Sequence, residues 1–600
     1  MTAIVPDAAC HRRTDRRRTR WEHPGNAATR GARPGTGPGR GMGIMDGMRL
    51  RPDGAGLAGA HVMSWVSLSP SFIPRTWWMT AASTAVSQTF GYVVGATGRA
   101  LVRRAGRALG VTVTVDPERI RPLERAAPWV MFGMSGISWL RSLKAQAEIA
   151  GLMETRPIRT REHVLGVAGG VALTAGLVGV GRGINGVAAT AGRVLKPVLP
   201  APVAAAVGAG ATAAGTAFVL DKVVYRQLLE RLSKAAQETN ARLLPGRVPP
   251  VEPERSGSDA SYEPWSTLGA KGQAVVSDGP RAVDIEEATG RPAMTPIRAY
   301  AGWREGRDLE ATAAAVVAEL HRTGAFEREV LLVLTTTGTG WLQEWSASSV
   351  EFLTGGNCAL AAMQYTYLPS GVAFFADRTT PVLAATALLG AIEAEFDRLP
   401  PDRRPKLLVG GESLGALGGT QAFEGLEDMI ERVDGAVWSG LPRFTEFWRS
   451  LVPFRRRGTP EIAPVVDDGR HVRFATRPQD LVTDVNGVPF GEWHRPRIVV
   501  AQHASDPVVW WSPELMWRKP DWAKEKAGLD VSRNLRWLPW VTFWQVASDM
   551  PQSVAVPGGH GHRYVEDMLH HWAAVLGQDP LDDYSRIAQA IRRTIVPNYA

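Results

Sequence analysis

Cysteine is almost absent from the sequence, which has only Cys10 and Cys358 among its 600 residues. Two thiols cannot build a disulfide scaffold or a zinc site made of several cysteines. The first 53 residues contain no apolar run, so they hold neither a signal peptide nor a core element. They are rich in Arg, Gly and Pro, and we expect residues 1–53 to be a disordered basic tail. Three methionines between positions 42 and 48 offer alternative starts.

Charge is distributed unevenly along the chain. Residues 1–53 hold 11 Lys or Arg and 5 Asp or Glu, residues 54–250 hold 22 and 9, and residues 251–600 hold 35 and 45. The three parts therefore carry net charges of +6, +13 and −10, which give the +9 of the whole chain. Nucleic-acid binding needs a basic face on a folded domain, and the second half of this chain is acidic. We expect no nucleic-acid partner.

Charged side chains are missing from five windows in the basic half. These windows are residues 54–74, 76–98, 126–140, 163–181 and 197–220. A membrane-spanning helix needs about 17–25 mainly apolar residues, so four windows qualify by length and the third is short. Their small residues suit close packing of membrane helices, and a soluble Ala- and Gly-rich bundle is the alternative. We expect an all-α membrane helical domain over residues 54–240.

The Lys and Arg residues between these windows indicate an orientation. With four spans, one side of the membrane collects 29 basic residues and the other collects 4, whereas five spans split them 21 against 12. Basic residues gather on the cytoplasmic side. We expect a multi-pass plasma-membrane protein whose C-terminal half is cytoplasmic, and one misjudged window would invert this orientation.

A connecting segment of about 55 residues follows the helical half. Five prolines and few apolar residues between 241 and 265 predict that residues 241–295 are a linker and packing segment. Ser256, Ser258 and Ser261 have no visible base partner, so we interpret them as structural.

Strand and helix patterns alternate from residue 296 to the end of the chain. The predicted strands are residues 296–303, 330–337, 359–367, 406–410, 434–440, 497–503 and 553–557, and the predicted helices are residues 309–324, 381–399, 413–426 and 562–577. This alternation predicts an α/β domain over residues 296–600, with a mostly parallel sheet and helices on both faces. Ligands bind at the carboxyl ends of the strands in such sheets.

The end of one predicted strand carries a nucleophile motif. Gly411-Glu412-Ser413-Leu414-Gly415 follows the strand at 406–410 and opens a predicted helix. G-x-S-x-G at a strand–turn–helix junction is the nucleophile elbow, in which the serine projects above the sheet. The string alone occurs by chance in Gly-rich chains, so its position between strand and helix is what identifies Ser413 as the predicted nucleophile.

A nucleophilic serine needs a base, and the base needs an acid that fixes its tautomer. In this fold class the acid follows the serine and the histidine follows the acid. Asp506, just after a predicted strand, is the best acid, and Asp434 and Asp549 are weaker candidates. His562 is the predicted base, with His560 as the alternative. The H-x-H pair lacks a further ligand at zinc spacing, so we expect no metal and no cofactor.

Two other parts of the site are predicted from their neighbours. Backbone N–H donors for an oxyanion are expected at Leu414 and in the Gly/Thr loop at Thr337, Gly338 and Thr339, unless that loop is a plain turn. Seven of the 21 tryptophans lie in residues 508–546, which predicts a cap over the site or, alternatively, a satellite core. The predicted substrate contacts are Trp341, Trp510 and Trp511.

The motifs, taken in order, resemble a family of actinobacterial-type membrane alpha/beta-hydrolase proteins. They are SLSPSFIPRTWW at 67–78, RSGSDAS, WSTLG, TGTGW, QYTYLPS, GESLG, QHASDPVVWW and GHGHRY, and together they cover about residues 60–600. The resemblance implies an alpha/beta-hydrolase fold preceded by membrane helices. It also implies serine-hydrolase chemistry on Ser413, Asp506 and a histidine of GHGH, and it implies no particular substrate.

These observations predict a membrane-anchored serine hydrolase. We expect an esterase or lipase that cleaves a lipid-like or acyl ester through an acyl-enzyme on Ser413. An acyltransferase that uses the same three residues is one alternative. A non-catalytic membrane scaffold with a degenerate hydrolase domain is the other.

Overall fold

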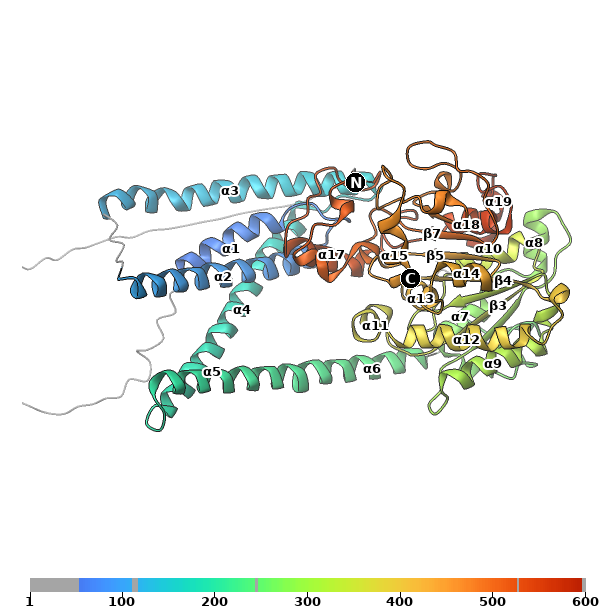
Figure 1. The fold of residues 1–600 in the computed structure, drawn as a ribbon, viewed down its shortest axis with the longest axis horizontal. Coiled ribbons are helices and arrows are strands. Elements are labelled where there is room, and N and C mark those ends of the chain that lie inside the picture. The colour runs from blue at the N-terminus through green and yellow to red at the C-terminus, as the bar shows by residue number, and fades with distance from the viewer. Residues whose placement is uncertain (1–52, 111–116, 243–245, 526–527, 596–600) are drawn as a thin grey trace, which may run out of the picture. The chain divides into compact units, whose positions relative to one another are not determined.

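The computed structural model describes residues 53–110, 117–242, 246–525 and 528–595. The predicted tail, residues 1–53, lies outside these ranges except for Asp53. A run of long helices precedes residue 242, and a parallel sheet with shorter helices follows it (Figure 1).

The described residues of the first part form six α-helices. They are α1 (Gly54–Ser67), α2 (Trp77–Ala108), α3 (Pro117–Leu152), α4 (Thr160–Leu195), α5 (Ala201–Phe218) and α6 (Arg226–Asn240), with a π-helical turn between the last two. Helix α2 packs against both α1 and α4, and α4 packs against α5. Glycines allow these close approaches, since a Cβ on Gly95 of α2 would collide with the Ala55 carbonyl of α1.

Two helices of the described chain are long and apolar enough to cross a membrane, Thr160–Leu195 and Ala201–Asn240. A third is possible if the bent pair Ser370–Ala376 and Thr380–Phe396 counts as one span. The predicted windows at 163–181 and 197–220 match the first two. The prediction of a span at 54–74 is wrong, because α1 ends at Ser67 after 14 residues, about 21 Å of helix.

The window at 76–98 forms most of α2, but α2 is not among the helices that are apolar enough to cross a membrane. Its inner face is polar and buried, with Thr80, Ser83, Thr84 and Ser87 turned into the bundle. The short window at 126–140 lies within α3. By length and composition, the described chain therefore supports two candidate spans instead of the four predicted.

The second part is organised by a seven-stranded parallel sheet. The strands are β1 (Ile297–Ala301), β2 (Val330–Thr335), β3 (Cys358–Met363), β4 (Lys406–Glu412), β5 (Gly435–Ser439), β6 (Val472–Ala475) and β7 (Arg497–Ala501), in the spatial order β1-β3-β2-β4-β5-β7-β6. Every neighbouring pair is parallel. Helices cover both faces, so the strands read as continuous apolar runs, and the predicted α/β architecture is confirmed.

Each face of the sheet packs against its own set of helices. One core joins Leu331 and Val333 of β2 to α9 (Leu309–Arg322) and α12 (Thr380–Phe396). The other joins Leu332 and Leu334 to α10 (Glu344–Leu353), α18 (Asp567–Leu576) and α19 (Ser585–Thr594). The remaining helices are α7 (Gly269–Ser277), α8 (Ala282–Thr289), α11 (Ser370–Ala376), α13 (Leu414–Thr420), α14 (Leu426–Arg432), α15 (Glu446–Leu451), α16 (Pro507–Trp510) and α17 (Val541–Asp549).

Three predictions about these elements are wrong. Residues 553–557 form turns instead of a strand, because the run is short, ends in Pro557 and buries only Val556 in the core. Strand β6 was not predicted, since its charged Arg473 interrupts a run of only four residues. The helix at 562–577 is shorter than predicted and is not the last one, because α19 follows it.

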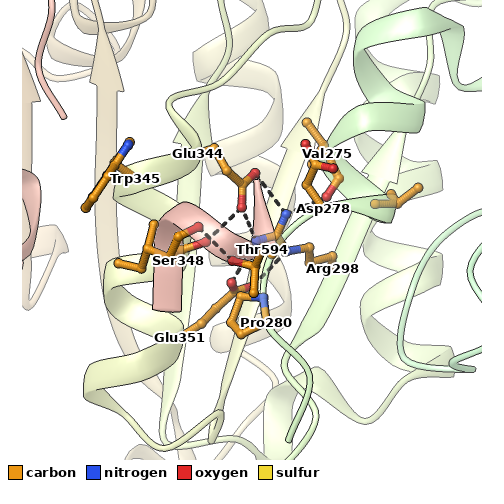
Figure 2. A network of polar contacts seen from close by, with 12 residues as sticks. Val275, Asp278, Pro280, Arg298, Glu344, Trp345, Ser348, Glu351 and Thr594 are labelled. Atoms are coloured by element: carbon orange, nitrogen blue, oxygen red, sulfur yellow. Dashed lines mark hydrogen bonds and ion pairs between the residues drawn. The ribbon is translucent and has the colours of Figure 1, made fainter. Parts of the chain in front are cut away.

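The segment predicted to be a linker and packing segment packs against the α/β fold. Arg255 forms a parallel bridge with Arg298 of β1, and Ser256 accepts a hydrogen bond from the Tyr300 N–H at 3.0 Å. The buried Arg298 guanidinium lies between two carboxylates, 2.5 Å from Glu344 and 2.7 Å from Glu351 (Figure 2). Its Nη1 also donates to the Val275 carbonyl of α7, so one side chain joins α7, β1 and α10.

The stretch between α1 and α2 binds α17 (Val541–Asp549), which begins in the predicted cap, residues 508–546, and ends just after it. The buried Asp549 of α17 accepts hydrogen bonds from the Ser71 hydroxyl at 3.2 Å and the Phe72 N–H at 3.1 Å. Arg75 lies 3.9 Å from the same carboxylate. Gln545, one turn earlier in α17, donates to the Ser67 carbonyl. The motif at 67–78 is therefore a junction between the helical part and the α/β part.

Candidate active site

Ser413 occupies a strained turn between β4 and α13. Its φ of 58° and ψ of −115° are unusual for a residue with a side chain, and strain of this kind is typical of the nucleophile elbow. The glycines of the motif permit it. A Cβ on Gly415 would collide with the Thr335 carbonyl, and a Cβ on Gly411 would lie 2.6 Å from the Gly415 carbonyl carbon. Ser413 itself is half-buried.

Asp506 and His562 meet directly. The Asp506 Oδ2 lies 2.6 Å from the His562 Nδ1, although 56 positions separate the two residues. Asp506 comes five residues after the end of β7 and caps α16, where its Oδ1 accepts the Val508 N–H at 2.8 Å. These contacts hold the carboxylate in one orientation toward the imidazole.

The imidazole of His562 also lies next to the serine elbow. The Ser413 N–H donates to the Ser439 carbonyl at 2.9 Å, and a Cβ on the next residue, Gly440, would collide with the His562 ring. The Nε2 of His562 is buried and has no hydrogen-bond partner among the described residues. With the Nδ1 proton donated to Asp506, this Nε2 is left as an acceptor.

The electrostatics of this pair favour a basic imidazole. Burial alone would lower the pKa of His562, but the charge of Asp506 and the hydrogen bond to it outweigh burial, so the pKa lies above its usual value. An imidazole with a raised pKa accepts a proton more readily, as a general base must.

The alternative candidates lie elsewhere. His560 has its Nδ1 3.2 Å from Asp530, so the structure pairs Asp506 with His562 and not with His560. Asp434 accepts the Leu407 N–H at 2.7 Å near the amino ends of the strands. Asp549 binds the α1–α2 junction, as described above.

The backbone N–H groups predicted to bind the oxyanion differ in whether they already have a hydrogen-bond partner. Leu414 is the first residue of α13, so its N–H is one of those that the helix cannot bond internally. Thr337 is ruled out as a donor, because its N–H bonds the Trp341 carbonyl at 2.8 Å. Gly338 and Thr339 lie in the turn between these two residues and remain candidates. A Cβ on Gly338 would lie 2.5 Å from the Leu368 carbonyl, so only glycine fits there.

The three predicted substrate tryptophans occupy three different surroundings. Trp341 lines a void of about 10 Å³ beside Glu412. Trp510 is fully buried and donates from its Nε1 to the His503 carbonyl at 3.0 Å. Trp511 packs edge-on against Phe374 and Phe375 of α11. The tryptophans of residues 508–546 thus belong largely to the core, and Trp511 alone of the three joins an aromatic cluster that includes Phe444.

Two residues beside the pair were not predicted. The Tyr564 hydroxyl donates to the Asp506 Oδ2 at 2.8 Å, and its ring stacks on His503 at 4.1 Å. The buried Glu412 carboxylate accepts the Gln343 amide at 2.9 Å, and burial raises the pKa of Glu412 to about 7. Both lie within the motifs GHGHRY and GESLG, but only the folded arrangement gives them partners.

Comparison with protein families agrees with this architecture. A model described as an alpha/beta-hydrolase family matches residues 297–587, and the model for the N-terminus of an alpha/beta-hydrolase family matches residues 68–280. The chain therefore belongs to this alpha/beta-hydrolase family, whose members have an N-terminal domain before the hydrolase domain. No curated protein matches the chain. Within the described ranges, no group of three or more His, Cys, Asp or Glu side chains is arranged to hold a metal ion.

Proposed function

We propose that the chain is a membrane-associated serine hydrolase that acts on a lipid-like acyl ester. The observation that carries this proposal is the 2.6 Å hydrogen bond between Asp506 and His562 beside the strained Ser413 elbow. The family supports a hydrolase in general, and this geometry supports a serine nucleophile in particular.

In the proposed reaction, the Ser413 Oγ attacks the ester carbonyl while the His562 Nε2 takes the hydroxyl proton. Asp506 stabilises the imidazolium that forms. The Leu414 N–H, with a second N–H from Gly338 or Thr339, stabilises the oxyanion. The imidazolium then protonates the departing alcohol, which leaves an acyl group on Ser413. Water, deprotonated by His562, attacks this acyl group and releases the acid and the free serine.

An apolar acyl chain suits the surroundings of the elbow. Leu414 and Leu417 pack with Ala373 of α11 in a small apolar cluster, with Leu368, Val382 and Phe444 at its edge. Phe375 of the same helix is 56% exposed, so an apolar surface continues outward from the cluster. An acyl chain on Ser413 would gain from burial against these side chains.

The membrane association rests on the two candidate spans. If both cross, the chain enters the first span and leaves the second on the same side of the membrane, so the α1–α2 junction and the α/β part lie together on that side. The hydrogen bonds from Ser71 and Phe72 to Asp549 require that arrangement, because partners in direct contact cannot be separated by a bilayer. The Lys and Arg residues near the spans favour the cytoplasmic side.

Labelling with a fluorophosphonate probe tests the nucleophile. Membranes that contain Ser413→Ala should show no labelling, while Ser450→Ala, at an exposed serine of α15, should label as the unmodified protein does. His562→Ala should abolish labelling and His560→Ala should retain it. Persistent labelling of Ser413→Ala, or loss of labelling only in His560→Ala, would overturn the assignment.

An acyltransferase is the second candidate, favoured by one observation. The His562 Nε2, which would deprotonate the attacking water, is buried, so bulk water has little access to the base beside an acyl group on Ser413. An alcohol bound in the site would then compete with water for the acyl group. Product analysis with added alcohols distinguishes the two, since a transferase yields mainly new esters and a hydrolase mainly free acid.

A further inference from the structure

A large cavity lies beside the candidate active site but is not lined by Ser413 or His562. Its volume is about 860 Å³, and Thr476 after β6, His503 after β7 and His560 contribute to its walls. The carboxyl ends of the strands are where ligands bind in parallel sheets. The cavity is therefore placed like a ligand site, two or three strands away from β4.

One wall of this cavity carries three consecutive arginines in an otherwise acidic domain. Arg455 is fully engaged, since it donates to Asp521, Glu525 and the Thr459 carbonyl. Arg456 is bound to Asp484. Arg457 lines the cavity, is exposed and has no partner among the described residues.

The carboxylates of the cavity are already bound to internal donors. Asp480 accepts the Thr476 N–H at 3.0 Å, and Glu525 accepts the Glu461 N–H at 2.6 Å in addition to Arg455. Asp530 is bound by Ser505 and His560. Because these acceptors are satisfied, the charge left without a partner among the described residues of this wall is the guanidinium of Arg457, which suits a carboxylate or phosphate.

The adjoining space carries several aromatic side chains together with the charged Glu525 and Arg533. A second cavity of about 250 Å³ shares Ile462, Ala504, Glu525 and Gly528 with the first, so the two adjoin. Its walls include Trp510, Trp522 and Phe72, the last of which comes from the α1–α2 junction. Phe72 and Trp522 are in ring contact at 5.1 Å. A ligand that extends from Arg457 past Ile462 would reach these rings.

We propose that the two adjoining cavities together bind an anionic amphiphile, with its carboxylate or phosphate group on Arg457 and its apolar chain against Ile462, Trp510 and Trp522. This site is separate from Ser413, and the proposal does not rest on the proposed function. His503 lines the first cavity and bonds the Gly561 carbonyl at 2.9 Å, and the nearby buried Ser505 accepts the Gly561 N–H at 2.8 Å. The site thus adjoins the backbone that holds Asp506 and His562.

Tryptophan quenching in the whole protein, purified in a nonionic detergent, tests this site. The probe is 12-bromododecanoate, whose bromine quenches nearby indole rings. We expect saturable quenching in the unmodified protein, and binding about tenfold weaker in Arg457→Gln, because one charge-assisted contact is lost. Arg449→Gln is the matched control, since Arg449 is a half-exposed arginine of α15 that does not line either cavity.

Further probes separate the parts of the proposal. Dodecyl phosphate should displace the bromine probe, which would show that the site accepts either anionic head. Acetate and inorganic phosphate should not displace it, and 12-bromododecanol should bind about as weakly to the unmodified protein as 12-bromododecanoate binds to Arg457→Gln. Equal binding of the alcohol and the acid, equal binding by Arg457→Gln and the unmodified protein, or unchanged quenching in Trp510→Phe/Trp522→Phe would overturn the proposal.

Discussion

Asp506 accepts more than the single hydrogen bond that a base-orienting acid requires. Its Oδ2 receives both the His562 Nδ1 and the Tyr564 hydroxyl, while its Oδ1 receives backbone N–H groups at the start of α16. Tyr564 in turn accepts the His503 N–H at 3.1 Å. The tyrosine therefore ties the strand end that carries Asp506 to the loop that carries His562.

Replacing Tyr564 with phenylalanine should weaken catalysis without removing any of the three reacting groups. Loss of a hydrogen bond to a charged carboxylate costs about 1.5–3 kcal/mol, so we expect kcat/KM for an ester substrate to fall roughly 10- to 100-fold. Tyr584→Phe is the control, because that hydroxyl bonds only the Asp579 carbonyl far from the site. Equal activities of the two variants would show that Tyr564 does not position Asp506.

Glu412 makes the fold itself sensitive to pH. Burial raises the pKa of Glu412 from 4.5 to about 7, so the folded protein keeps the proton that the unfolded chain has already lost. The resulting stability is complete below pH 4.5 and is lost as pH rises toward 7. The charge of Glu412 also helps to keep the pKa of His562 raised.

We predict that Glu412→Gln removes this loss of stability. The shift corresponds to about 3 kcal/mol at most, so between pH 5 and pH 8 the melting temperature of the unmodified protein should fall more than that of the variant. The exposed Glu431→Gln serves as the control and should follow the unmodified protein. Melting curves that move in parallel for Glu412→Gln and the unmodified protein would contradict the role of this carboxyl group.

At the scale of elements, backbone contact between α1 and α2 depends on individual glycines. A Cβ on Gly95 would meet the Ala55 carbonyl, whereas a Cβ on Gly98, almost one turn later in the same helix, would meet open space. Glycine lowers helix stability by about 1 kcal/mol relative to alanine. Gly98→Ala should therefore raise the melting temperature, and Gly95→Ala should lower it by forcing the helices apart. The same direction of change in both variants would show that the α1–α2 contact is not tight.

The elements differ in how well the sequence predicts them. Six of the predicted strands are found because a parallel sheet buried on both faces needs uninterrupted apolar runs, and the Ser413 motif needs only its neighbours in the chain. Strand β6 escaped prediction because Arg473 is buried by stacking on Phe490 and Trp493, partners that the local sequence does not reveal. The role of Tyr564 likewise depends on its contact with the distant Asp506. The N–H of Thr337 is occupied by the Trp341 carbonyl only once the loop has folded.

The windows without charge illustrate a different limit. Absence of charge is shared by a membrane span and by a helix whose small polar side chains are buried between other helices, as in α2. Length distinguishes the window at 54–74 from a membrane span, since α1 ends after 14 residues. The window at 76–98 is distinguished from a membrane span only by the burial of Ser83, Thr84 and Ser87 inside the bundle.

At the scale of the whole molecule, a buried ion pair between Arg75 and Asp549 joins the helical part to the α/β part. Arg75 and Asp549 are both buried, and burial raises the pKa of Asp549 to about 6 even beside the arginine. Breaking one partner of a buried pair costs about 3–5 kcal/mol, whereas an exposed pair contributes about 1 kcal/mol or less.

Arg75→Met should therefore lower the melting temperature of the protein far more than Arg99→Met, which removes an exposed pair with Asp53. We also expect faster proteolysis within residues 508–553 in Arg75→Met, because α17 loses its hold on the junction. Thermal unfolding and limited proteolysis of the two variants provide the comparison. Similar melting temperatures would show that the junction contributes little to the fold.

The pairing of Arg255 and Ser256 with β1 decides where the hydrolase can be separated from its helices. A fragment that starts at residue 296 would lose the residues that flank the edge strand and would leave Tyr300 and Arg298 without their cover. A fragment that starts near Arg247 would keep them, along with the Arg247–Asp278 ion pair. The smallest fragment that keeps the α/β fold covered therefore begins some fifty residues before its first strand.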